Sequence, residues 1–386
     1  MSMKTHQDRS FQSLIKTEKK RGACALAGPF YSIVEHTAPI AAMLGIPMLT
    51  KEPSILFNFK RFYPDLKCEF RDWTLPYLIK NYSTVFYGFN VSEYTFRELI
   101  GHFKEEDPQN PIWDLPIKFI YHLHGCSDKH WFKSNAHSHL FDVDQVLLYG
   151  KRMVDLFKGL DLEKRLVSYG LVGNYRLSYY KKHQEFFDSL VEKEIFSKFK
   201  KKQTTLLYAP TWMDAKKGSS IFKAYQHVIE KLPDSMNLLI KLHPNLSLHY
   251  DSHDPRPLYE ALDQYASRPN VQIVPLFPCI YPILNKVDAY LGDYSSVGYD
   301  ALSFSLPMFF INHHKLDYLR DPTAYLLRCG TSIATDDLEK IYSIIDKELP
   351  KDCEKFSKIR KETYHYAFGV DPTYSEMQQR LKKFLL

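Results

Sequence analysis

The chain has 386 residues and a formal net charge of +6, which is modest for a protein of this size. Its length exceeds what one hydrophobic core usually holds, so we expect two domains of roughly 180 residues each. Six cysteines without Cys-x-x-Cys or His/Cys ligand spacing argue against a zinc site and a disulfide framework. The polar start, and the lack of an apolar run long enough to cross a bilayer, indicate a cytoplasmic protein.

The first half of the chain has the pattern of alternating strands and helices. Apolar runs predict a strand at residues 23–26, a helix that continues to Met43 and a strand at 46–50. Further strands are predicted at residues 84–86, 117–121 and 145–148. His36 follows Glu35 on the predicted helix. A lone histidine there is more often a surface or core residue than a catalyst, so we expect a structural role for it.

The run Tyr-His-Leu-His-Gly at residues 121–125 follows one of these strands. Gly125 allows the backbone to turn sharply, so that His124 can project into a cleft. Because side chains alternate along a strand, His122 lies on the same face as His124, and either histidine could be the functional one. Imidazole exchanges a proton near neutral pH and therefore suits acid-base catalysis. The residues expected to cap the next helix are Ser127, Asp128 and Lys129.

Two glycines, Gly170 and Gly173, are spaced as turns after strands. A Gly-x-x-Gly pair alone is weak evidence for phosphate binding, so we assign both glycines to turn geometry. Arg176 follows them and is a candidate contact for a donor phosphate. The polar, helix-like stretch 178–202 comes next, and we expect it to connect the two domains.

Three apolar strands in the second half are each followed by polar side chains. The strands are predicted at residues 205–209, 238–242 and 289–291. The polar residues are Thr211 after the first strand, Lys241 and His243 at the second, and Asp293 after the third. A helical pattern at 221–232 separates the first two strands, as the crossover of a parallel sheet requires. The polar groups should therefore face one cleft at a sheet edge.

The third of these junctions has the features of an anion site. Asp293 would lie at the carboxyl edge of the sheet, where open α/β folds bind their ligands. Ser295 and Ser296 would open a helix whose first backbone N–H groups are unpaired, so hydroxyls and amides can converge on a phosphate. A carboxylate beside a diphosphate would be repelled, so we expect Asp293 to orient its neighbours rather than to act as a nucleophile.

These motifs resemble those of the CDP-glycerol glycerophosphotransferases, which build polymers of the teichoic-acid type. Tyr-Ala-Pro-Thr at 208–211, Lys-Leu-His-Pro at 241–244 and Asp-Tyr-Ser-Ser at 293–296 stand in the order of that family. Residues 121–129 resemble its Trp-His-Gly-Thr-Pro-Leu-Lys segment, although only His, Gly and Lys are retained. The residues after Tyr-Ala-Pro-Thr, where the family commonly has an aromatic residue and then Arg, are Trp212, Met213 and Asp214.

The resemblance implies an α/β fold of the GT-B type, in which two Rossmann-like domains with parallel sheets face a central cleft. Residues 1–177 would form the acceptor-side domain, and 178–202 the linker. Residues 203–370 would form the domain that binds the nucleotide donor. A last helix at 371–386 would cross back to the first domain.

The same resemblance implies a transferase that moves a polyol phosphate, expected to be glycerol phosphate, from a CDP-linked donor to a hydroxyl acceptor. The acceptor would be a polyol phosphate or lipid-linked. His124 would remove the acceptor proton, and His243 would assist the departing phosphate of CMP. The residues expected to bind the donor are Thr211, Lys241, Asp293, Ser295, Ser296 and Arg176. No metal or cofactor is required, although a divalent cation could arrive with the nucleotide.

Other interpretations of the chain remain open. It could be a GT-B glycosyltransferase with another nucleotide-sugar donor, or a binding protein that has kept the fold without catalysis. Basic clusters at 16–21 and 198–202 adjoin apolar residues and can contact an anionic membrane, although a solvated surface is the commoner reason for such clusters. Peripheral contact with the inner face of the cell membrane is compatible with this charge. No recognised motif for nucleic-acid binding accompanies it.

Overall fold

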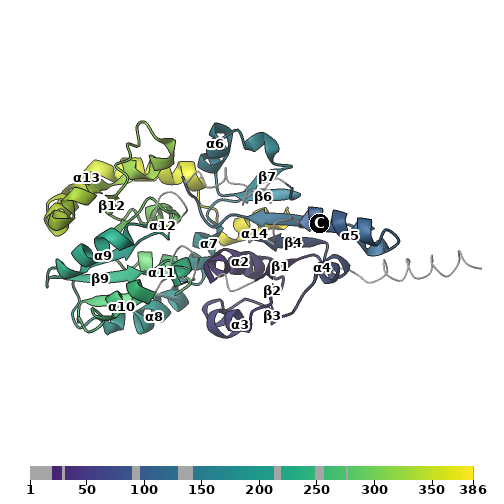
Figure 1. Ribbon diagram of the computed structural model, residues 1–386, viewed down its shortest axis with the longest axis horizontal. Helices are drawn as coiled ribbons and strands as arrows, with labels where there is room; N and C mark the ends of the chain where they lie inside the picture. Colours follow the sequence, from purple (N-terminus) through teal and green to yellow (C-terminus); the bar gives the residue numbers. More distant parts are fainter. Residues whose placement is uncertain are drawn as a thin grey trace, which may run out of the picture.

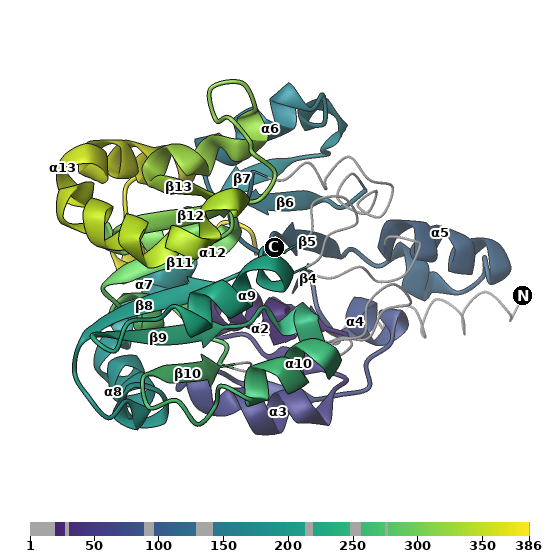
Figure 2. The ribbon, with the colours of Figure 1, turned by 60° about the vertical axis from the view of Figure 1, so that its left-hand side comes forward.

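The computed structural model describes residues 20–27, 31–88, 96–128, 142–212, 219–247, 256–274 and 277–385. Two parallel sheets, each flanked by helices, lie next to one another (Figures 1 and 2). Helices α2 and α7 lie in the middle of the molecule, between the two sheets (Figure 1). The predicted α/β class with two parallel sheets is therefore confirmed.

The first sheet has seven strands in the order β3-β2-β1-β4-β5-β6-β7, and all of its pairings are parallel. Its strands are β1 (Ala23–Leu26), β2 (Met48–Thr50), β3 (Cys68–Phe70), β4 (Thr84–Tyr87), β5 (Lys118–His122), β6 (Gln145–Leu148) and β7 (Tyr169–Leu171). The chain moves outward from β1 to β3 and then returns to pair β4 with β1. The strand order thus reverses between β1 and β4, which is where doubly wound folds open a crevice.

The second sheet repeats this plan with six strands in the order β10-β9-β8-β11-β12-β13. Its strands are β8 (Thr204–Ala209), β9 (Met236–Lys241), β10 (Val271–Val274), β11 (Ala289–Gly292), β12 (Met308–Asn312) and β13 (Thr331–Ala334). Strands β8 and β11 pair in parallel at the point where the order reverses. The segments that follow these two strands are therefore neighbours at the carboxyl edge.

Helices cover both sheets and fill the space between them. Those before the second sheet are α2 (Tyr31–Leu44), α3 (Pro53–Phe59), α4 (Leu75–Asn81), α5 (Phe96–Glu106), α6 (Lys151–Gly159), α7 (Tyr175–Lys182) and α8 (Gln184–Glu194). The later ones are α9 (Ile221–Glu230), α10 (Arg256–Asp263), α11 (Ile280–Leu284), α12 (Ser296–Ala301), α13 (Ile341–Phe368) and α14 (Tyr374–Lys382). None of the helices in the described part of the chain is both long enough and apolar enough to cross a membrane.

The hydrophobic core continues from one domain to the other. Along β8, Leu206 and Tyr208 face one side of the sheet and belong to a core of the second domain alone. Leu207 and Ala209 face the opposite side and belong to a cluster that also contains the core of the first domain. The two domains therefore pack through a shared apolar face, and this contact fixes how the two sheets lie relative to each other.

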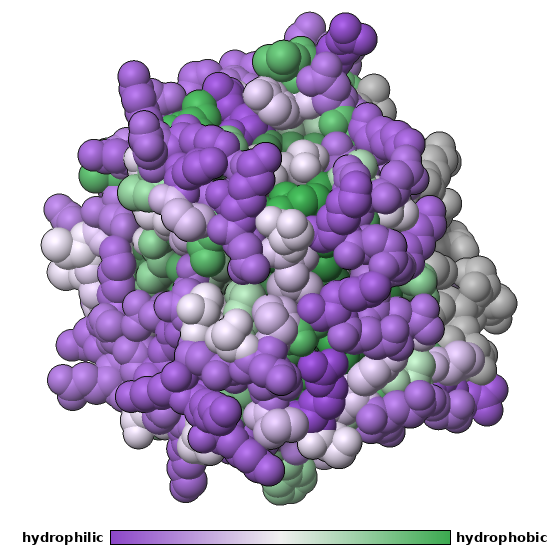
Figure 3. Space-filling model, turned by 90° about the vertical axis from the view of Figure 1, so that its left-hand side faces the viewer, coloured by the Kyte–Doolittle hydropathy of each residue, from purple (hydrophilic) through white to green (hydrophobic). Residues whose placement is uncertain are grey.

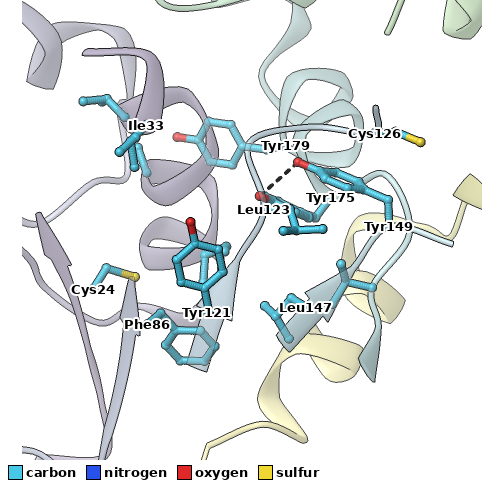
Figure 4. Packing of buried hydrophobic residues seen from close by; sticks show 14 of the residues in the cluster. Cys24, Ile33, Phe86, Tyr121, Leu123, Cys126, Leu147, Tyr149, Tyr175 and Tyr179 are labelled. Carbon is cyan, nitrogen blue, oxygen red and sulfur yellow. Dashed lines mark hydrogen bonds between the residues drawn. The ribbon is translucent and has the colours of Figure 1, made fainter. Parts of the chain in front are cut away.

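Buried tyrosines are prominent in the first domain, as Figure 4 shows. Tyr149 and Tyr175 stack with their ring centroids 5.6 Å apart, and their hydroxyl groups lie 3.3 Å apart. Tyr121 and Tyr179 are buried in the same cluster. Burial of a tyrosine contributes a large apolar area, but its hydroxyl also needs a partner, and the Tyr149 hydroxyl finds two, in the Tyr175 hydroxyl and in Nδ1 of His36.

The C-terminal helix α14 packs on the first domain. Thr373 and Glu376 form a reciprocal capping box that begins the helix. Gln378 donates a hydrogen bond to the Met43 carbonyl oxygen at 2.8 Å, and Arg380 donates one to the Val172 carbonyl oxygen at 3.2 Å. The chain thus returns to the first domain after it has completed the second.

The two glycines assigned to turns differ in the structure. Gly173 has a φ of +75°, which suits a turn that only glycine forms easily. Gly170 instead lies inside β7, so its assignment to a turn is wrong. A Cβ atom at Gly170 would lie 2.4 Å from a ring carbon of Phe384, so close packing with the C-terminal segment explains this glycine.

Figure 3 shows the face of the second domain that points away from the first. Hydrophilic residues cover most of this face, and hydrophobic residues are scattered between them. Apolar residues scattered singly are normal on protein surfaces.

Candidate active site

The predicted donor side lies where β8 and β11 end. The Asp293 carboxylate is buried, and its Oδ2 accepts a hydrogen bond from the Thr211 backbone N–H at 2.7 Å. The same oxygen lies 3.5 Å from the backbone N–H of Ser220, at the start of α9. Asp293 thus joins the segment after β8 to the next helix. This arrangement fits the orienting role predicted for Asp293.

The two predicted serines begin α12. Ser295 is the N-cap residue, but its buried Oγ makes no capping hydrogen bond and lies near the Tyr290 hydroxyl group. Buried hydroxyls usually use their full hydrogen-bonding capacity, so one that does not can bind a ligand. Ser296 is half-buried and faces the first domain. The predicted anion site thus has one hydroxyl available to a phosphate oxygen.

Lys241 and His243 lie at the end of β9, next to β8 in the sheet. Lys241 is buried, and this burial lowers the pKa of its ammonium group, while the nearby Glu35 opposes the shift. His243 is half-buried, and its ring stacks on Trp212 with centroids 6.1 Å apart and an interplanar angle of 27°. The structure therefore brings both residues to the same edge as Asp293, and stacking restricts the orientation of the imidazole.

The two histidines around the end of β5 have different environments. His122 is fully buried, and its Nε2 lies 2.9 Å from the Thr37 hydroxyl group. Burial lowers the pKa of His122 to about 3. His124 is half-buried beyond the strand end. Of the two candidates, His124 is therefore the one that a substrate can reach, and His122 has the contacts of a structural residue.

The neighbours of His124 indicate how it can act. Its Nε2 contacts the carbonyl oxygen of Gly88, which can only accept a hydrogen bond, so this nitrogen carries the proton. Burial lowers the pKa of His124, so its ring is neutral near pH 7. Nδ1 of the neutral ring is then unprotonated and can accept a proton. This is the state that a general base requires.

His36 belongs to the site, although its position on a helix suggested a surface or core role. Its ring centroid lies 6.1 Å from that of His124. Its Nδ1 lies 3.0 Å from the Tyr149 hydroxyl oxygen, which orients the ring. Burial lowers the pKa of His36 well below its usual value, and the positive charge of Arg176 adds to this effect. The available signal was its place on the helix after β1, beside the point where the strand order reverses.

The two sides of the site touch at Gly125 and Ser296. Gly125 has a φ of +112°, and a Cβ atom placed on it would lie 2.6 Å from the Ser296 Cβ. His36 Cε1 would lie 3.7 Å from the same point. The acceptor-side segment therefore approaches α12 so closely that a side chain at Gly125 would collide with it.

Arg176 lies on α7 and is bound to two carboxylates. Its Nη2 donates a hydrogen bond to Asp300 Oδ1 at 2.6 Å, and its Nη1 donates one to Glu35 Oε1 at 3.2 Å. Glu35 also accepts a hydrogen bond from the Ile280 backbone N–H at 3.0 Å. Arg176 thus connects α2 with helices of the second domain. Its contact with a donor phosphate stays a prediction, and in this structure the guanidinium is engaged elsewhere.

Two other predicted features can be placed only in part. Lys129 lies outside the described residues, as do Lys16 and Lys19 of the first basic cluster. The lysines of the second cluster are exposed: Lys198, Lys200, Lys201 and Lys202. Among the residues that the structure describes, no three His, Cys, Asp or Glu side chains are grouped so that they could hold a metal ion.

Comparisons with known proteins place this geometry in context. Residues 179–365 match the model of a family described as CDP-glycerol:poly(glycerophosphate) glycerophosphotransferase. A sequence search of curated proteins found no match. The matched segment contains all the predicted donor-side residues of the second domain.

Solved structures share the fold. The wall teichoic acid polymerase TagF has a TM-score of 0.58 at 13% identity, with 99% of this chain and 98% of that chain covered. A TagF variant soaked with CDPG has a TM-score of 0.60 at 14% identity, with 99% and 98% covered. The S. aureus MnaA-UDP structure has a TM-score of 0.58 at 13% identity, with 94% of each chain covered. At these identities the likeness shows the fold alone, and the predicted two-domain GT-B architecture is confirmed.

Proposed function

Because residues 179–365 match the model of the family described as CDP-glycerol:poly(glycerophosphate) glycerophosphotransferase, we propose that this chain transfers a polyol phosphate from a CDP-linked donor to a hydroxyl acceptor and releases CMP. Glycerol phosphate is the group that the family description favours. The single observation that carries the proposal is the contact of Gly125, next to His124, with Ser296 of the donor side. The proposed base and the proposed anion site, which come from the two domains, thus lie next to each other.

The proposed reaction begins with His124. Its unprotonated Nδ1 would take the proton of the acceptor hydroxyl as the oxygen attacks the distal phosphorus of the donor. A new bond forms between the acceptor oxygen and phosphorus, and the bond between phosphorus and the bridging oxygen of CMP breaks. His243 would hydrogen-bond the leaving phosphate and can give it a proton. Phosphoryl transfer of this kind depends mainly on positioning and charge stabilisation.

The donor-side residues would hold the diphosphate. Ser295 Oγ and the first amides of α12 would bind the phosphate oxygens as negative charge shifts onto them. Thr211 would contact the phosphate or the cytidine side, with its backbone fixed by Asp293. Lys241 would neutralise charge at the edge of the site. We propose that no resident metal or cofactor takes part, although a divalent cation can accompany the nucleotide. Turnover should then persist in a metal chelator or return with added Mg²⁺.

The proposed acceptor is a polyol phosphate or a lipid-linked molecule. A lipid-linked acceptor would bring the protein to an anionic membrane surface, for which the exposed lysines at 198–202 supply positive charge. Sedimentation with vesicles of anionic phospholipid tests this contact. Binding that falls with added salt would support it, and no binding at low salt would contradict it.

A second candidate function is sugar transfer from another nucleotide donor. The likeness in fold to the MnaA-UDP structure, which contains a uridine nucleotide, makes uridine donors the ones to compare. A thermal-shift panel with CDP-glycerol, CDP-ribitol, CMP, UDP-sugars and GDP-sugars separates the two, because a ligand that binds only the folded state raises its stability. Stabilisation by cytidine ligands followed by CMP release supports the proposal. Stabilisation by uridine or guanosine ligands alone would replace it with a sugar transferase, and no stabilisation would favour a non-catalytic protein.

A further inference from the structure

Asp128 is a buried carboxylate that both domains share. Its Oδ1 accepts hydrogen bonds from Arg152 Nε at 2.9 Å and from Arg152 Nη2 at 2.5 Å. The same oxygen accepts a hydrogen bond from the Tyr299 hydroxyl group at 2.6 Å. Its Oδ2 accepts one from the Leu326 backbone N–H at 2.9 Å. The sequence predicts Asp128 as a cap of the next helix, and the residues that directly follow it lie outside the described part of the chain; its described contacts are with both domains.

The partners of Asp128 come from opposite sides of the cleft. Arg152 lies on α6 of the first domain, so the ion pair forms within that domain. Tyr299 lies on α12 of the second domain, three residues after Ser296. Asp128 itself follows His124 by four residues. One carboxylate therefore joins the segment that carries His124 to the helix that Ser295 and Ser296 begin.

The buried charge of Asp128 and its hydrogen bonds make the contact with Tyr299 strong. Burial raises the pKa of Asp128, while Arg152, Tyr299 and the Leu326 N–H oppose the shift. A buried carboxylate is costly unless it is paired and fully hydrogen-bonded, and here both oxygens are satisfied. Hydrogen bonds to ionised groups are shorter and stronger than neutral ones. The Tyr299 hydroxyl group thus forms a directed bond across the domain boundary, in addition to the apolar packing.

We propose that Asp128 is a positioning residue for the transfer reaction and that, through Tyr299, it sets the separation between His124 and the serines of α12. The contact between Gly125 and Ser296 is a second fixed point between the same two segments. Two contacts restrict both the distance and the rotation of one segment relative to the other. This inference rests on the proposed function, because it assigns His124 and the serines their roles.

The test compares two Tyr→Phe substitutions that each remove a buried hydroxyl group. Tyr299→Phe removes the side-chain hydrogen bond across the boundary and leaves both the Asp128–Arg152 pair and the hydrogen bond from the Leu326 backbone N–H in place. Tyr342→Phe is the matched control, because Tyr342 on α13 donates to the Val228 carbonyl oxygen within the second domain. CMP release from CDP-glycerol, with glycerol 3-phosphate as acceptor, gives kcat and KM for each protein. Misplacement by about 1 Å can cost on the order of 100-fold in rate.

We expect Tyr299→Phe to lower kcat at least tenfold, with KM for CDP-glycerol changed by less than about twofold. Tyr342→Phe should lower thermal stability by a similar amount without this loss in kcat. In an Asp128→Asn background, Tyr299→Phe should add little to the loss, since the two residues act through one bond. Equal kcat values for Tyr299→Phe and the control would overturn the proposal.

Hydrogen–deuterium exchange separates this inference from the proposed function. Tyr299→Phe should speed exchange in β5 and its following segment and also in α12, whereas Tyr342→Phe should not. If the unaltered protein releases no CMP but shows this exchange pattern, the proposed function fails and the link between the segments stands. If exchange in both segments is unchanged by Tyr299→Phe, the positioning role fails whatever the activity.

Discussion

The donor and acceptor sides of the cleft are built in different ways. On the donor side, Asp293 fixes the segment after β8 through backbone N–H groups of the same domain. On the acceptor side, His124 and His36 are placed by side-chain contacts between separate elements. The donor-side residues each lie just after a strand of one sheet, so each of them stands in a short sequence motif. The acceptor-side residues are placed by side-chain contacts between elements that are far apart in the chain. Such contacts produce no local motif, so the acceptor side is harder to recognise from the sequence.

The largest expected effect comes from the acceptor side. His124→Ala should lower the rate of CMP release about 100- to 10,000-fold, because it removes the general base. Donor affinity should change little, since the donor lies on the other domain. Stopped CMP-release assays and calorimetric titration with CDP-glycerol measure the two quantities.

His227→Ala is the control for this substitution, because His227 lies on α9 and pairs with Glu339 at 3.0 Å. It should keep full activity. Donor affinity that falls together with the rate in His124→Ala would contradict the separation of the two sides.

On the donor side, Asp293→Ala should weaken CDP-glycerol binding and lower the free energy of unfolding. A buried backbone N–H that loses its acceptor costs about 1–3 kcal/mol. The matched control is Asp288→Ala, because Asp288 accepts from the Thr205 backbone N–H at 2.7 Å at the opposite end of the same strands. Urea denaturation and donor titration should show a stability loss in both variants but a binding loss only in Asp293→Ala.

The contact between the two sides can be tested with Gly125→Ala. The substitution strains a positive φ and forces a methyl group against Ser296, so we expect an approximately tenfold loss of kcat, in line with a displacement below 1 Å. Gly45→Ala has a similar backbone strain at a φ of +65°, but no atom lies within 4 Å of the added Cβ. A loss of activity of equal size in both variants would show that strain, and not the contact, is responsible.

The smallest effect concerns pH and the structural histidine. The pKa of His122 is lowered to about 3, so the folded state stays neutral while the unfolded state takes up a proton below about pH 6.5. Stability is therefore lost as the pH falls, by about 2 kcal/mol between pH 7.5 and pH 5 for this one group. In His122→Gln the free energy of unfolding should fall by about 2 kcal/mol less than in the unaltered protein between pH 7.5 and pH 5. Urea denaturation at both pH values of the two proteins checks this, and parallel curves would contradict the buried neutral state.

The sequence predicted the centre of each sheet and missed its edges. The central strands, such as β1 and β11, are fully buried and have continuous apolar runs. The apolar run at residues 308–311 after Pro307 also predicts β12, so the strands without a predicted counterpart are the outermost ones: β3, β7, β10 and β13. They are short and partly exposed, so their residues carry little of the apolar pattern that identifies a strand. Edge strands can therefore be identified only when the positions of the neighbouring strands are already known.

The same limit applies to the candidate site, whose residues can be predicted only where a local sequence pattern marks them. The sequence does predict Thr211, His243 and Asp293, because each of them follows a recognisable strand. A proline, glycine or serine close to each residue marks the end of that strand. The places of His36 and Asp128 could not be predicted, because they depend on Tyr149 and Tyr299, which lie more than a hundred residues away in the chain. No local pattern encodes a contact between such distant residues.

The return of the chain to the first domain affects how the two domains stay together. The first passage between the domains precedes β8, and the long helix α13 makes the second, since its end packs on α6 of the first domain. Docking of α14 then holds the end of the chain on the first domain through Gln378 and Arg380. A protease cut between α8 and β8 should therefore leave the two fragments bound to each other, whereas the same cut in a protein that lacks residues 374–386 should let them separate more readily.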